Sequence, residues 1–175
     1  MSYQRVALIG LGLIASSMAH AMRAAGFSGE IIGFAKSAET RAVAKGLFCD
    51  RVTETAAEAV VGADLVVLAV PVGAMGAIAE EIAPHLKPGA VVTDVGSVKQ
   101  AVVDAVAPHL PKGVHFIPGH PLAGTEYSGP RSGFATLFQN RWWLLTPLPD
   151  TDPEALAGLK QFLVGLGANV DEMEV

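Results

Sequence analysis

The sequence contains a single cysteine, Cys49, among its 175 residues, so the chain cannot form an internal disulfide. Its apolar runs, such as Leu65–Val70, are far shorter than the ~20 residues that a membrane-spanning helix needs. The N-terminal residues pass directly into the first predicted strand, which leaves no room for a signal peptide. We therefore expect a cytoplasmic protein with no membrane association, in which Cys49 is a small, half-buried hydrophobic residue.

Other absences narrow the range of functions. The net charge is −5, and no lysine and arginine cluster is long enough to follow a nucleic-acid backbone, so we expect no nucleic-acid partner. No Cys/His cluster has the spacing of metal ligands, and no G-x-S-x-G motif supports serine hydrolase chemistry. Apolar residues form 51% of the chain and aromatic residues only 6%, which is typical of strands covered by helices on both faces. At this length, residues 1–175 are expected to form one domain.

Predicted strands and helices alternate along the whole chain. The strands are predicted at Val6–Ile9, Glu30–Phe34, Asp50–Val52, Asp64–Val70, Ala90–Asp94, Val114–Ile117, Trp142–Thr146 and Ala168–Glu172. The helices are predicted at Leu13–Ala25, Ser37–Lys45 (ended by Gly46), Ala56–Val61, from after Pro71 to Ile82, Ser97–Ala107 and Pro153–Leu166. This order predicts an α/β, doubly wound Rossmann-type fold with a mostly parallel sheet and right-handed crossovers. Ligands of such sheets bind at the carboxyl ends of the strands, so functional residues should directly follow strands.

The first strand is followed by Gly10-Leu-Gly12 and Ala15, a G-x-G-x-x-A pattern that opens a helix. In this context the pattern indicates dinucleotide binding: the first glycine allows the turn, the second lets the backbone approach a pyrophosphate, and the third position must be small. The helix N-terminus then offers N–H groups to the anion. The alternative is a glycine turn that binds nothing.

The end of the second strand bears on the choice of dinucleotide. NAD sites usually carry an acidic residue there, whereas Ala35 takes that place here and is followed by Lys36, Ser37 and, later, Arg41. We therefore predict that NADP is favoured over NAD, unless Lys36 and Arg41 are ordinary solvated charges. The predicted cofactor-binding residues are Gly10, Gly12, Leu13, Ile14, Ala15, Ala35, Lys36, Ser37, Val70 and Pro71.

Two further segments follow strands and carry polar side chains. In Thr93-Asp-Val-Gly-Ser-Val-Lys99, the position of Ser97 suits a helix N-cap, and its hydroxyl could equally orient a catalytic group. Lys99 is expected to be a surface or structural charge, and the less favoured alternative is a contact with a substrate carboxylate. The loop Pro118–Ser132 is rich in glycine yet holds His120, which can accept a proton near neutral pH. His120 is therefore either catalytic or a hydrogen-bonded structural histidine, and Glu126 is either a polar site group or solvated.

These motifs, in this order and spacing, resemble the prephenate/arogenate (cyclohexadienyl) dehydrogenase family of tyrosine biosynthesis. The likeness is carried by Gly10–Ser17, Thr93–Lys99 and Gly119–Gly129, with Ala15 in place of the family's usual third glycine. It implies oxidative decarboxylation of a small molecule, prephenate or arogenate, with hydride transfer to NAD(P)+. It also implies that His120 is the catalytic base, that Ser97 positions it, and that Thr125 and Glu126 line the substrate pocket.

Members of this family continue into a helical domain that dimerises and adds substrate-binding residues. The resemblance implies that this chain ends where that domain would begin, that a full-length protein is a homodimer, and that the chain alone binds a dinucleotide with little or no turnover. Two alternatives stay open. One is a β-hydroxyacid dehydrogenase-like enzyme, although such enzymes carry Ser-Gly-Gly in place of Gly119-His-Pro121. The other is a dinucleotide-sensing module without catalysis.

Overall fold

The computed structural model describes residues 2–175 and contains two sheets. Six strands form a parallel sheet in the order β3-β2-β1-β4-β5-β6, and three more form a smaller mixed sheet in the order β7-β8-β9. The strands are β1 (Arg5–Ile9), β2 (Glu30–Phe34), β3 (Arg51–Thr53), β4 (Leu65–Leu68), β5 (Val91–Asp94), β6 (His115–Phe116), β7 (Gly119–Pro121), β8 (Trp142–Leu145) and β9 (Asn169–Glu172). The order of the large sheet is that of a dinucleotide-binding doubly wound fold, which confirms the predicted fold class.

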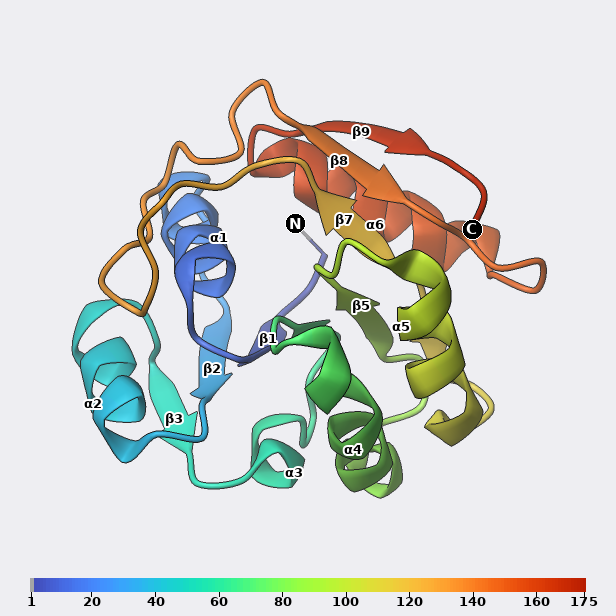
Figure 1. The fold of residues 1–175 in the computed structure, drawn as a ribbon, viewed down its shortest axis with the longest axis horizontal. Coiled ribbons are helices and arrows are strands. Elements are labelled where there is room, and N and C mark those ends of the chain that lie inside the picture. Colours follow the sequence, from blue (N-terminus) through green and yellow to red (C-terminus); the bar gives the residue numbers. More distant parts are fainter. Residues whose placement is uncertain (1) are drawn as a thin grey trace.

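The helices cover both faces of the large sheet (Figure 1). They are α1 (Leu13–Ala24), α2 (Ala38–Leu47), α3 (Ala56–Ala59), α4 (Val72–Ile82), α5 (Lys99–Val106) and α6 (Pro153–Gly165), with short 3-10 turns at Ala83–His85 and Ala107–His109. Gly46 does not end α2 as predicted, because the helix continues to Leu47 and Gly46 does not adopt the positive φ of a C-terminal glycine cap. Among residues 2–175, no helix is long and apolar enough to cross a membrane.

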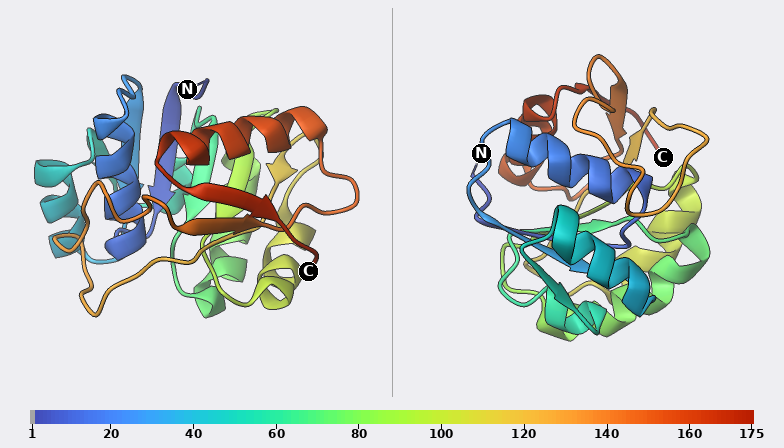
Figure 2. Two further views of the ribbon diagram at one scale, coloured as in Figure 1. Left: turned by 90° about the horizontal axis from the view of Figure 1, so that it is seen from above. Right: turned by 90° about the vertical axis from the view of Figure 1, so that its left-hand side faces the viewer.

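The alternation of side chains along the central strands divides the core into two layers. In β1, Val6 and Leu8 pack with α1, α6 and the small sheet, whereas Ala7 and Ile9 pack with α3, α4 and α5. Both sets are completely buried, which explains why the central strands read as continuous apolar runs. Figure 2 shows α6 and the small sheet lying beside α1, on the same side of the large sheet.

The small sheet was not predicted as a separate unit. Gly119–Pro121 was expected to be part of a loop, but it forms β7, which pairs antiparallel with β8, and β8 pairs parallel with β9. β7 lies at the edge of its sheet, where a strand tolerates Pro121 because that edge needs no N–H donor. The long connection from β7 to β8 runs back toward α1 and α2 (Figure 1), where the Phe134 N–H donates to Ser17 Oγ at 3.1 Å.

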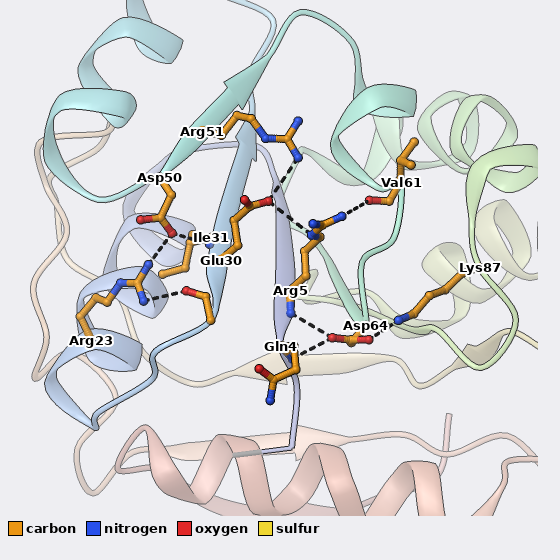
Figure 3. A network of polar contacts seen from close by, with 11 residues as sticks. Gln4, Arg5, Arg23, Glu30, Ile31, Asp50, Arg51, Val61, Asp64 and Lys87 are labelled. Atoms are coloured by element: carbon orange, nitrogen blue, oxygen red, sulfur yellow. Dashed lines mark hydrogen bonds and ion pairs between the residues drawn. The ribbon is translucent and has the colours of Figure 1, made fainter.

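Ion pairs gather at the amino ends of the parallel strands, away from the edge where ligands are expected (Figure 3). Glu30 forms ion pairs with Arg5 and Arg51 at 3.3 and 3.2 Å, and Asp64 pairs with Lys87. Asp64 also accepts the N–H groups of Gln4 and Arg5 at 2.7 and 2.9 Å. Burial by itself would raise the pKa of Asp64, but these hydrogen bonds and the charge of Lys87 hold it below its ordinary value of 3.8.

Candidate functional site

A groove of about 730 Å³ opens at the carboxyl edge of the large sheet. It is formed by the turns that follow β1, β2 and β4, together with Gly129 and Pro130 from the long β7–β8 connection. The groove contains six of the ten predicted cofactor-binding residues: Gly10, Gly12, Ala35, Lys36, Val70 and Pro71. The fold therefore brings together residues from three separate strand–helix junctions, as ligand binding in this class of sheet requires.

The two glycines of the first turn have different surroundings. Gly10 has a φ of 96°, and a Cβ there would lie 2.6 Å from the carbonyl oxygen of Ala69. Gly12 has an ordinary φ of −95°, and a Cβ there would meet nothing within 4 Å. Gly12 is also the N-cap of α1 and supplies no side-chain cap, so the first N–H groups of that helix remain available to an anion.

The other predicted residues of this turn support the groove from behind. Ala15 is completely buried, which agrees with the requirement for a small residue where helix and strand pack. Leu13 and Ile14 are half-buried and pack against the core, and neither lines the groove. Ser16 Oγ donates to the carbonyl oxygen of Gly12 at 2.6 Å, which ties the first turn of α1 to the glycine loop.

The turn after β2 carries the residues that bear on the choice of dinucleotide. Ser37 Oγ accepts the Thr40 N–H at 3.3 Å and so caps α2, and it is not among the groove-lining residues. Arg41 donates to the carbonyl oxygens of Ala35 and Lys36 at 2.8 and 3.0 Å. Arg41 therefore holds the shape of this turn, whereas Lys36 is an exposed cation on the groove wall.

The segment after β5 differs from the prediction at Ser97. α5 begins at Lys99, its N-cap is Val98, and no side-chain hydroxyl caps it. The N-cap prediction for Ser97 is therefore wrong, because the chain stays extended for one residue longer than the Ser97 position suggested. Ser97 is exposed at the carboxyl edge of the sheet, and its proposed role in positioning a catalytic group remains a prediction.

Lys99 forms a buried ion pair with Asp94 and is not a surface charge. The Asp94 side chain is completely buried and that of Lys99 is only 10% exposed. Lys99 Nζ donates both to Asp94 Oδ2 and to the carbonyl oxygen of Gly119, the latter at 2.6 Å. The other carboxylate oxygen, Asp94 Oδ1, accepts the Gly119 N–H at 3.1 Å. The pair thus fixes both sides of the residue that precedes His120.

Gly119 lies where a side chain would be crowded. A Cβ on Gly119 would lie 3.1 Å from the Asp94 carbonyl oxygen, 3.1 Å from Trp143 Nε1 and 3.2 Å from Thr93 Oγ1. The hydrogen bonds of Gly119 to Asp94 and Lys99 join β7, and with it His120, to the carboxyl end of β5.

His120 is half-buried in β7 and lies opposite Leu144 of β8. Burial and the positive charge of Lys99 lower its pKa from 6.5, and the negative charge of Asp94 opposes this shift only in part. The imidazole is therefore neutral at neutral pH and able to accept a proton. The pKa of Lys99 is itself lowered by burial, more than its pairing with Asp94 raises it.

The two residues predicted to line a substrate pocket lie further along the same loop. Thr125 and Glu126 are both exposed, and neither lines the groove. Thr125 Oγ1 accepts the Tyr127 N–H at 3.1 Å and so shapes the loop. Among residues 2–175, no group of three His, Cys, Asp or Glu side chains could hold a metal ion.

Residues 18–172 match the family model described as prephenate dehydrogenase, nucleotide-binding domain. The chain is 41% identical over 172 residues to the cyclohexadienyl dehydrogenase of Zymomonas mobilis, an alignment that covers 98% of this chain and 58% of that protein. The chain thus spans little more than half the length of this relative.

Two solved structures have nearly the same fold. The prephenate dehydrogenase of A. aeolicus, in complex with hydroxyphenyl propionate and NAD+, has a TM-score of 0.90 and 32% identity, with 99% of this chain and 61% of that chain covered. The arogenate dehydrogenase of Synechocystis has a TM-score of 0.88 and 32% identity, with coverages of 97% and 59%. The resemblance inferred from the motifs is confirmed: the chain belongs to the prephenate dehydrogenase family and constitutes its nucleotide-binding domain.

Proposed function

We propose that this chain is the cofactor-binding and partly catalytic domain of an NAD(P)-dependent dehydrogenase. The reaction would be the oxidative decarboxylation of prephenate or arogenate in tyrosine biosynthesis. The observation that carries the proposal is the position of His120, a half-buried imidazole held at the same sheet edge as the dinucleotide groove. Relatives named for this chemistry support it.

The groove suits a nicotinamide dinucleotide. Gly12 leaves open space beside an uncapped helix N-terminus, and Ala74 and Ile78 of α4 give the far wall an apolar surface. Such a cofactor, when bound, accepts the hydride that the substrate loses. The N-terminus of α1 would hold the pyrophosphate, and Val70 and Pro71, which follow β4 and line the groove, would contact the cofactor.

The proposed role of His120 is to accept the proton of the substrate hydroxyl as the hydride leaves its carbon. A neutral imidazole is required for this step, and the lowered pKa of His120 supplies it. We further propose that Ser97 orients the imidazole or the substrate, and that Thr125 and Glu126 contact substrate when their loop closes over the site. Release of carbon dioxide gives an aromatic ring, so the protein needs chiefly to align the substrate and remove one proton.

We propose that NADP binds more tightly than NAD. The support is the absence of an acidic residue at Ala35–Ser37 and the exposed ammonium group of Lys36 on the groove wall. Calorimetric titration of the chain with NAD+ and NADP+ side by side tests this directly. Tighter binding of NAD+, the dinucleotide named for the A. aeolicus structure, would overturn the preference.

A His120→Asn variant tests the catalytic role. In the chain together with any residues that follow it in its natural protein, the variant should bind the dinucleotide with unchanged affinity. It should lose about 10²–10⁴-fold in kcat with prephenate and arogenate, the range typical of a missing general base. Unchanged turnover would refute the role of His120, and no turnover in the unmodified protein would favour a sensing module.

We propose that the protein is cytoplasmic and that the full-length form is a homodimer. The single cysteine supports the first point. The exposed apolar side chains of Trp142, Met173 and Val175 near β8 and β9, which are 51%, 49% and 52% exposed, support a further contact surface. Light scattering of the full-length protein tests the oligomeric state, and a monomer at micromolar concentration would contradict it.

A further inference from the structure

Asp94 and Lys99 form a buried ion pair. Burial of such a pair usually adds little to the stability of a fold, so stability alone does not explain why it is there. Removing two charges from water can cost more free energy than their attraction returns. The other ion pairs in the described chain have side chains between 23% and 48% exposed, whereas Asp94 is 0% and Lys99 10% exposed. The pair also lies beside His120 at the carboxyl edge of the sheet.

We propose that Asp94 and Lys99 are positioning residues for His120, which fix its backbone and set the charge that its imidazole experiences. This inference rests on the proposed function for its catalytic meaning, but the geometry stands without it. Lys99 Nζ bridges the Asp94 carboxylate and the Gly119 carbonyl oxygen, and Asp94 accepts the Gly119 N–H. Both polar groups of the residue before His120 are therefore held by one ion pair.

The bridge connects three elements that are distant in sequence. Asp94 ends β5, Lys99 begins α5, and Gly119 begins β7. The Gly96 N–H donates to Asp94 Oδ2 at 2.8 Å, so the carboxylate also shapes the turn between strand and helix. Any shift of α5 or of this turn is thereby transmitted to β7 and to the imidazole of His120.

The charges of the pair act on His120 in opposite directions. The charged groups that act on this imidazole are Lys99 from α5 and Asp94 from β5, while β8 places the apolar Leu144 opposite it. Lys99 disfavours the imidazolium form and Asp94 favours it, and burial adds to the effect of Lys99. A base that must be neutral before it can accept a proton benefits from this balance, since it stays active at lower pH.

The test is the titration of His120 followed by NMR, with the ring labelled, in single variants of the pair. Lys99→Met should move the midpoint of His120 to higher pH, and Asp94→Asn should move it to lower pH. Loss of a merely structural contact would instead move both midpoints in the same direction, toward that of an unperturbed histidine. The matched control is Lys87→Met, which removes the ammonium of the Lys87–Asp64 pair at the opposite edge and should leave His120 unchanged.

A lone buried charge can prevent folding, so the double variant Asp94→Asn/Lys99→Met completes the set. Its midpoint should lie between those of the single variants. Shifts of equal sign in the single variants, a double variant outside their range, or no shift beyond that of the Lys87 control would overturn the proposal.

Measurements of turnover, compared with the NMR titrations, distinguish a failure of this inference from a failure of the proposed function. If His120 is the catalytic base, Lys99→Met should move the acid limb of the pH profile of kcat/KM to higher pH. If His120→Asn leaves turnover intact while the NMR shifts appear as expected, the proposed function fails and the positioning role stands. If His120→Asn abolishes turnover while the NMR midpoints do not move, the proposed function stands and the positioning role fails.

Discussion

Gly10 and Gly12 belong to the same turn, yet alanine should have different effects at the two positions. At Gly10 the backbone is left-handed, with a φ of 96°, which costs a residue with a Cβ about 1–2 kcal/mol. The new Cβ would also lie 2.6 Å from Ala69 O and 2.9 Å from Val70 N, both backbone atoms that cannot move aside. Overpacking of this kind adds about 1–3 kcal/mol.

Gly10→Ala should therefore destabilise the domain by about 2–5 kcal/mol, offset by only about 0.4–1 kcal/mol from the stiffer unfolded chain. That loss is a large part of a total stability of about 5–15 kcal/mol. In urea unfolding followed by circular dichroism, the midpoint should fall by about 1–2 M, given a mid-range slope of about 2 kcal/mol per molar.

Gly12→Ala is the matched comparison, because its Cβ would meet nothing within 4 Å and its φ is −95°. Its urea midpoint should stay nearly the same, because the loss of a favoured N-cap residue offsets the gain from the stiffer unfolded chain, while dinucleotide affinity should fall about tenfold or more as the methyl group occupies the approach of the pyrophosphate. An unchanged urea midpoint for Gly10→Ala would refute the strain argument. Unchanged affinity for Gly12→Ala would show that no pyrophosphate approaches this turn.

Three further perturbations test other parts of the structure. Because the pKa of Asp64 is lowered in the folded state, its ionised carboxylate stabilises the fold above pH 3.8, and this stabilisation is lost as the pH falls below that value. Asp64→Asn should therefore be less stable than the unmodified chain at pH 7 and should lose less stability than that chain during acid titration. Burial, aided by Asp50, raises the pKa of Cys49 to about 12, so iodoacetamide at pH 8 should modify Cys49 only in urea, and rapid modification of the folded chain would contradict its burial. Lys36→Ala should weaken NADP+ binding about three- to tenfold and leave NAD+ unaffected, with the exposed Lys45→Ala as control; equal losses for both dinucleotides would refute a contact with the 2′-phosphate.

The sequence was sufficient for those parts of the fold that depend on local pattern. All six strands of the large sheet occur where they were predicted, and no strand end differs by more than two residues. The rule that ligands bind at the carboxyl edge also predicted correctly that Gly10, Ala35 and Val70 lie around one groove. These predictions depend on periodicity and on the topology of parallel sheets, and neither requires knowledge of distant contacts.

The errors arise where distant contacts decide the structure. β7 is only three residues long and includes Pro121, so its local pattern resembles a loop, and it becomes a strand because β8 lies beside it. Ser97 was a reasonable N-cap by residue type. However, α5 starts later, at Lys99, whose ammonium is engaged with Asp94 and with the carbonyl of Gly119.

The role of Asp94 and Lys99 was the most important omission. Lys99 was expected to be a surface or structural charge, or less favourably a contact to a substrate carboxylate, and its pairing with Asp94 was not predicted. The sequence nevertheless contains an indication of the pair. An aspartate at the end of a buried strand is not solvated by water and needs a charged partner, and the lysine that opens the next helix is close enough to be that partner. Read in this way, Asp94 and Lys99 could have been paired from the sequence, although the link to Gly119 could not.

Stability alone does not account for this pair, and the distinction can be measured. The side chains of Arg5, Glu30 and Arg51 are 36–48% exposed, and exposed pairs of this kind contribute at most about 1 kcal/mol each. The buried pair offers little more in net terms, because replacing a buried ion pair with well-packed hydrophobic residues of similar volume is often neutral or stabilising. We therefore expect Asp94→Asn/Lys99→Met to lose little beyond the about 1–3 kcal/mol that the unpaired Gly119 carbonyl oxygen costs, so that the variant stays folded while kcat falls. A double variant that unfolds instead would assign the pair to stability and remove the argument for its action on His120.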